Sequence, residues 1–129
     1  DPESITSGDI DGDSRDEVVI DFGASYGIWI WHDDGTWLQI TAVDPESITS
    51  GDIDGDSRDE VVIDFGASYG IWIWHDDGTW LQITAVDPES ITSGDIDGDS
   101  RDEVVIDFGA SYGIWIWHDD GTWLQITAA

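Results

Sequence analysis

The sequence predicts an all-β fold made of three identical four-stranded antiparallel units. Residues 1–43, 44–86 and 87–129 repeat one 43-residue sequence, and the single difference is Ala129 where the other copies have Val. Each copy holds four short runs rich in β-branched and aromatic residues, separated by turn-forming residues. No segment of ten or more residues has apolar side chains at helical spacing. This period and strand number are typical of one blade of a β-propeller, so we predict three blades per chain with these boundaries.

The first half of each repeat is predicted to hold a turn, two strands and an acidic loop. Residues 1–4 are a predicted turn, because their Asp-Pro pair favours turn initiation. Residues 4–10 alternate apolar and small polar side chains, as a short strand does. Residues 11–16 are an acidic loop, and the β-rich residues 17–22 predict the second strand.

The second half is predicted to hold a short turn followed by a hairpin. Residues 24–27 are the turn, and residues 28–31 are a strand with both Trp on one face and both Ile on the other. The Asp-Asp-Gly sequence at 33–35 is the strongest hairpin signal of the repeat. Residues 36–41 complete the sheet as its fourth strand.

The middle strands carry apolar side chains on both faces, which predicts how the units pack. A sheet with one solvated face would show a polar residue at every second position, whereas a blade between two other blades buries both faces. We therefore expect Trp29, Trp31 and Trp37 to lie in the core between neighbouring blades. The alternative, in which these rings form a platform for a ligand, stays open.

Composition excludes several classes of partner. The formal net charge is −27, from 30 acidic residues against three basic ones. Neither a nucleic acid nor an anionic membrane is an expected partner, because contact with phosphate groups needs Lys and Arg. The charge also costs stability through self-repulsion, which bound cations would relieve. Cys is absent, so disulfides are excluded.

The acidic loop is the strongest candidate site. Carboxylates stand at alternating loop positions, at Asp9, Asp11, Asp13 and Glu17, and the carbonyl oxygen of Arg15 can face the same centre. A hard cation such as Ca²⁺ binds six to eight oxygens, so this pattern predicts a metal site rather than a solvated turn. The spacing differs from that of an EF-hand, whose Gly and last Glu stand elsewhere. Asp16 is an alternative to Glu17 as the last ligand.

The segment from Gly8 to Gly23, Gly-Asp-Ile-Asp-Gly-Asp-Ser-Arg-Asp-Glu-Val-Val-Ile-Asp-Phe-Gly, resembles the FG-GAP/VCBS type of repeat. That repeat occurs in the integrin α-subunit propeller and in related bacterial and fungal propeller lectins. The resemblance covers nearly all of each copy and implies a calcium loop between the first, innermost strand and the second. The family usually has Asp at the last ligand position, where this chain has Glu17.

The resemblance implies one Ca²⁺ per repeat, held by four carboxylates and one carbonyl group. The implied ligands are Asp9, Asp11, Asp13, Arg15 and Glu17 in the first copy, Asp52, Asp54, Asp56, Arg58 and Glu60 in the second, and Asp95, Asp97, Asp99, Arg101 and Glu103 in the third.

The identity of the three copies predicts an origin and an assembly. Natural repeats diverge, so identity favours a designed, perfectly symmetric propeller fragment over a recent gene duplication. Propellers typically close with four to eight blades, and three blades leave two apolar faces bare. We therefore expect the chain to associate with itself, as a homodimer with six blades or a homotrimer with nine.

These observations predict a self-assembling scaffold with a Ca²⁺ site in each blade and no natural biological activity. The alternative is a carbohydrate-binding module, with Tyr26, Trp29, Trp31, Asp33 and Asp34 as candidate contacts to a glycan. We expect no enzymatic activity, because His32 is the only conventional base of each repeat and no nucleophile stands in a recognisable setting.

Overall fold

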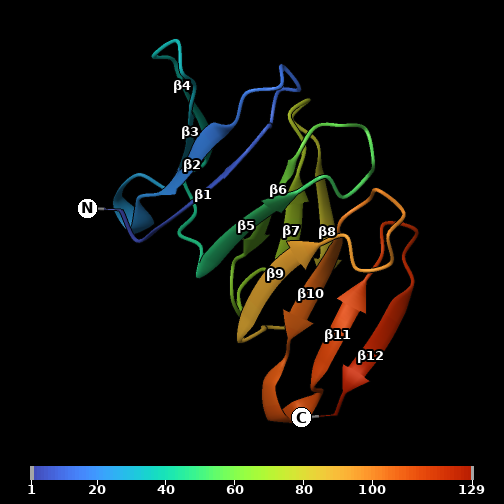
Figure 1. The fold of residues 1–129 in the computed structure, drawn as a ribbon. Helices are drawn as coiled ribbons and strands as arrows, with labels where there is room; N and C mark the ends of the chain where they lie inside the picture. Colours follow the sequence, from blue (N-terminus) through green and yellow to red (C-terminus); the bar gives the residue numbers. More distant parts are fainter. Residues whose placement is uncertain (1, 129) are drawn as a thin grey trace.

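The computed structural model describes residues 2–128 and confirms an all-β fold. Three four-stranded antiparallel sheets follow one another along the chain, and each lies within one predicted repeat (Figure 1). Asp1 of the predicted first turn and Ala129 at the end of the third repeat lie outside the described residues. Within 2–128 the helices are single 3₁₀ turns, and none has the length and hydropathy of a membrane-spanning helix.

Each sheet is a meander whose strands pair in chain order. The first sheet consists of β1 (Ser4–Gly8), β2 (Glu17–Asp21), β3 (Ile28–Trp31) and β4 (Trp37–Thr41), with a 3₁₀ turn at Gly23–Ser25. The second consists of β5 (Ser47–Gly51), β6 (Glu60–Asp64), β7 (Ile71–Trp74) and β8 (Trp80–Thr84). The third consists of β9 (Ser90–Gly94), β10 (Glu103–Asp107), β11 (Ile114–Trp117) and β12 (Trp123–Thr127), with a 3₁₀ turn at Gly109–Ser111.

The first strands of the three sheets lie side by side, as the innermost strands of propeller blades do. β5 contacts β1 on one side and β9 on the other, and the remaining strands fan outwards from them (Figure 1). The Asp-Asp-Gly hairpins form as predicted, with the His32 amide donating to the Thr36 carbonyl oxygen at 2.9 Å. This arrangement fits three consecutive blades of a propeller.

Neighbouring blades pack through two unlike faces. Cross-strand pairing places Val19 beside Ile30 on one face of the first blade, and Val61 beside Trp74 on the opposite face of the second. Together these side chains form one buried cluster. The second and third blades repeat the same packing with the equivalent residues. Each blade therefore presents an Ile-rich face to the blade that follows and a Trp-bearing face to the blade that precedes.

The two end blades each leave one of these faces open. Ile10 and Ile53 are 0% and 1% exposed, whereas the equivalent Ile96 of the third blade is 57% exposed. At the other end, Ile5 of the first blade is 67% exposed, whereas its equivalent Ile48 packs against the core. The difference arises from position in the chain, because the three copies are identical in sequence apart from Ala129.

The prediction for the Trp residues is correct for one of the three positions in the repeat. Trp74 and Trp117, equivalent to Trp31, are buried between blades. The prediction is wrong for Trp37, which is 50% exposed on the open face of the first blade, and its equivalents Trp80 and Trp123 are still 37% exposed where a preceding blade is present. Trp29 is half-buried, and its ring meets that of Trp37 edge-on in an aromatic cluster at the outer side of the blade.

Candidate metal centre

The acidic loop connects β1 to β2, and its backbone turns sharply enough to gather its own side chains. Gly12 and Ser14 have φ values of 80° and 70°, in the left-handed region. The Asp9 carboxylate accepts hydrogen bonds from the amides of Gly12 and Ser14, both at 3.0 Å. The Asp13 carboxylate accepts one from the Arg15 amide at 2.9 Å. The loop therefore folds around the carboxylate of Asp9, the first of the predicted ligands.

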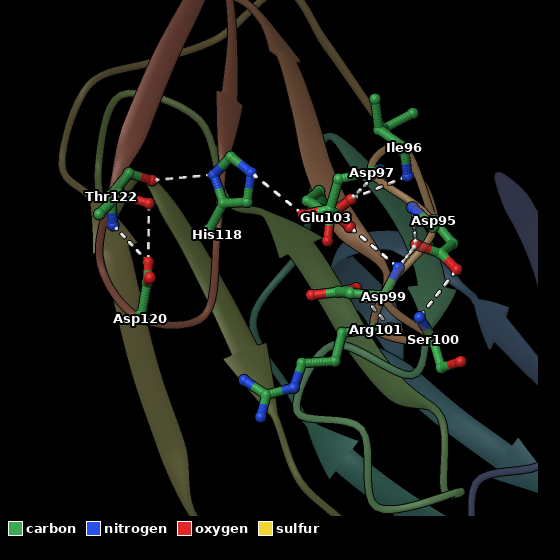
Figure 2. A network of polar contacts seen from close by, with 11 residues as sticks. Asp95, Ile96, Asp97, Asp99, Ser100, Arg101, Glu103, His118, Asp120 and Thr122 are labelled. Carbon is green, nitrogen blue, oxygen red and sulfur yellow. Dashed lines mark hydrogen bonds and ion pairs between the residues drawn. The ribbon is translucent and has the colours of Figure 1, made fainter.

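This folding brings four carboxylates together in each repeat. One oxygen atom from each lies within 4.8 Å of the others, in an all-oxygen set that could bind a metal ion. Figure 2 shows the third loop, in which the Arg101 side chain extends away from the carboxylates. The clustered residues are Asp9, Asp11, Asp13 and Glu17, then Asp52, Asp54, Asp56 and Glu60, then Asp95, Asp97, Asp99 and Glu103.

The last carboxylate of the cluster is buried at the base of the loop. Glu17 is 3% exposed, and its Oε1 accepts hydrogen bonds from the amides of Ile10 at 2.8 Å and Asp11 at 3.2 Å. In the second blade, burial raises the pKa of Glu60 to about 8, and the neighbouring Asp54 adds to the rise. A buried carboxylate among other carboxylates favours a proton or a cation at the same place, so the site fits a divalent ion.

Four further residues line a pocket together with three of the clustered carboxylates. A pocket of ≈ 110 Å³ in the first blade is lined by Asp11, Asp13, Arg15, Glu17, His32, Asp33 and Asp34, and an equivalent pocket exists in the second blade. The Arg15 carbonyl group as a ligand stays a prediction.

Sequence reasoning missed His32 as a neighbour of the loop. In the other two blades the equivalent imidazoles stand close to the cluster, with His75 Nε2 3.9 Å from Asp54 Oδ2 and His118 Nε2 3.9 Å from Asp97 Oδ2. The available signal was the strand register, because pairing of Val18 with Trp31 places the next residue, His32, opposite Glu17.

Asp16, the alternative to Glu17 as the last ligand, does not lie in the carboxylate cluster. In the second blade the equivalent Asp59 faces the preceding blade, where its Oδ2 accepts a hydrogen bond from the Asp9 amide at 3.1 Å. Its own amide donates to the Asp9 carbonyl oxygen at 2.8 Å. Asp59 thus joins the metal loop of one blade to the next blade.

The candidate glycan contacts do not form one site. Tyr26 and Trp29 line an open aromatic pocket of ≈ 500 Å³ together with Phe22 and Trp37. Asp33 and Asp34 line the acidic pocket instead, and the equivalents of Trp31 in the second and third blades are buried between blades. In the second and third blades the aromatic pocket gains a wall from the preceding repeat, formed by Thr41 and Val43 or by Thr84 and Val86.

Comparisons with protein-family models, curated proteins and solved structures give no match for this chain. The support for a metal site is therefore the geometry of the clustered carboxylates.

Proposed function

We propose that the chain is a metal-braced propeller scaffold in which each acidic loop binds one Ca²⁺. The observation that supports this most directly is the gathering of four carboxylates around one point in every repeat. Carboxylate oxygens suit Ca²⁺, and a loop that encloses the ion without helices or thiolates has the chemistry of a structural calcium site. The proposed role of the ion is to neutralise the loop and fix the junction between β1 and β2.

A thermal unfolding experiment with and without Ca²⁺ tests this proposal. Ligand that binds only the folded state stabilises it by about 2.7 kcal/mol per site at a concentration about 100 times its Kd. We expect the melting temperature to fall in chelator and to recover when Ca²⁺ is added. The triple variant D9N/D52N/D95N is expected to lose this Ca²⁺-dependent change in melting temperature. The control variant D33N/D76N/D119N removes the same number of charges outside the clustered carboxylates and is expected to retain the change. An unchanged melting curve for the unmodified chain in chelator would reject the proposal.

We also propose that the chain closes a ring with copies of itself, as a homodimer of six blades or a homotrimer of nine. The support is the pair of open end faces, which are the same two surfaces that pack together inside the chain. Light scattering is expected to give two or three times the chain mass of 14.2 kDa. A stable particle with the mass of one chain would contradict this.

The identity of the repeats supports a designed origin, as an idealised form of an FG-GAP/VCBS-type blade with no natural activity. Enzymatic activity is not part of this proposal. The imidazoles of the second and third repeats stand beside carboxylates of the proposed metal loop, and the sequence places no Ser nucleophile in a recognisable setting.

A carbohydrate-binding module is the second candidate function. It is favoured by the aromatic pocket, in which the exposed rings of Tyr26 and Trp37 stand beside Trp29. Aromatic rings present apolar faces on which a sugar ring can stack. A glycan array tests this candidate, with the triple variant W37A/W80A/W123A as the control. Absence of signal across the array would remove it.

A further inference from the structure

The junction between blades is built on the first ligand position of the metal loop. Asp59 of the second blade exchanges two hydrogen bonds with the backbone of Asp9, and Asp102 of the third blade does the same with Asp52, at 3.1 Å and 2.8 Å. In both cases a carboxylate accepts from the amide of the residue that begins the loop. Each junction therefore holds the backbone of a metal ligand in place.

Glycine makes this approach possible. A Cβ atom on Gly8 would stand 2.6 Å from Asp59 Oδ2, and one on Gly51 would stand 2.6 Å from Asp102 Oδ2. The equivalent Gly94 of the third blade has open space, because the nearest atom to its Cβ position is Ile96 Cδ1 at 3.8 Å. The side chain that would fill this space is the equivalent of Asp59, from the acidic loop of a following blade.

Both halves of one further junction stand open at the ends of the chain. Asp16 of the first blade is exposed, whereas its equivalents Asp59 and Asp102 are half-buried. Asp95 of the third blade is also exposed, whereas Asp9 and Asp52 are half-buried. The first blade thus carries the Asp16 half of this contact, and the third blade carries the Gly94–Asp95 half, without a neighbouring blade at either end.

We propose that Asp16 of a second copy docks on Asp95 and Gly94, so that the partner completes the third metal loop and metal binding and ring closure strengthen each other. This inference rests on the Ca²⁺ sites and the self-association proposed above, and it adds the contact that couples them. A first ligand held by the neighbouring copy loses less conformational freedom when the ion binds. Because such coupling is reciprocal, an ion that binds the completed loop more tightly favours the closed ring by the same factor.

The first test uses glycine variants. Gly94→Ala places a methyl group where Asp16 of a second copy must approach, and the free chain has room for it. We expect Gly94→Ala to weaken association at least about 10-fold in sedimentation velocity, as loss of a charge-assisted hydrogen bond does. The melting temperature of the dissociated chain should stay unchanged. Gly51→Ala is the matched control, and it should lower that melting temperature, because Asp102 already occupies the space. Association of Gly94→Ala equal to that of the unmodified chain would overturn the proposal.

The second test asks whether Ca²⁺ binding and association with a second copy depend on each other. Asp16→Ala and Asp102→Ala are compared for the subunit dissociation constant in Ca²⁺ and in chelator, and for Ca²⁺ affinity by calorimetry. We expect Ca²⁺ to tighten association of the unmodified chain and of Asp102→Ala, and this effect to be lost in Asp16→Ala, with one of three sites per chain weakened.

The outcomes distinguish the coupling from the proposals on which it rests. A chain that binds no Ca²⁺ or never associates contradicts the proposed function. A chain that binds three Ca²⁺ and associates, but with a dissociation constant that is the same in Ca²⁺ and chelator, contradicts the coupling alone. Equal effects of Asp16→Ala and Asp102→Ala on association would also contradict it.

Discussion

A buried carboxyl group outside the metal loop contributes to how the fold responds to pH. Asp64 ends β6 and is 1% exposed, and its carboxylate accepts hydrogen bonds from the Gly66 amide at 2.8 Å and the Ser47 hydroxyl at 3.4 Å. These bonds hold the turn that leads to the third strand of the blade. Burial raises the pKa of Asp64 to about 6, and the nearby Glu46 and Asp87 add to the rise.

We expect Asp64 to make the metal-free protein lose stability as pH rises from about 4 to about 6. A carboxyl group with a higher pKa in the folded state binds its proton more tightly when the protein is folded. Its contribution to stability is therefore full below the pKa of the unfolded state and is lost as pH rises through the pKa of the folded state. Asp64→Asn keeps an acceptor for Gly66 and removes the titration. Melting temperatures measured against pH in chelator should therefore fall less steeply for this variant. Parallel slopes for the two proteins would contradict the prediction.

At the scale of the strand, position across the blade decides what a Trp does. Trp74 on β7 lies 5% exposed against the Ile-rich face of the first blade. Trp80 begins the outer strand β8 and is 37% exposed, with its ring 6.3 Å from that of Trp72. The two residues pair across neighbouring strands, yet only Trp74 is buried in the core formed with the preceding blade.

Truncation of these two residues should have unequal costs. Trp74→Ala removes a ring from the core between blades and is expected to cost about 3–5 kcal/mol of unfolding free energy. Trp80→Ala removes a ring that solvent already reaches, and roughly 1–2 kcal/mol is expected. Urea denaturation of the two variants measures the difference. Equal losses would show that the outer aromatic cluster contributes as much as the core.

The elements that could be predicted from the sequence are those encoded within one repeat. The alternation of residues 28–31, the Asp-Asp-Gly turn and the carboxylate spacing of the loop all act over a few residues, and the structure contains each of them. The exposure of the outer Trp residues and the role of Asp59 depend instead on how each blade packs against its neighbour. The position of His32 beside the acidic loop could be found only from the register of β2 and β3. No local pattern carries that information.

At the scale of the whole molecule, the exposure of equivalent residues depends on whether their blade has a neighbouring blade on that side. Ile53 is buried between the second and third blades, whereas Ile96 stands on the open face of the third. Their sequence surroundings are the same over the whole repeat. A difference in the unfolding free energy lost by the same substitution at the two positions therefore measures what a following blade contributes.

We expect this difference to depend on protein concentration. In dilute solution, where chains are separate, Ile53→Ala should cost about 2–5 kcal/mol, as large-to-small changes in a core do. Ile96→Ala should then cost less than about 1 kcal/mol, because its side chain is already in solvent. When the ring is closed, a second copy covers Ile96, and its truncation should weaken association and approach the cost at Ile53. Thermal melts of both variants over a concentration series measure this convergence. If Ile96→Ala stays neutral at concentrations where light scattering shows a closed ring, the Ile-rich face is not the surface that binds the second copy.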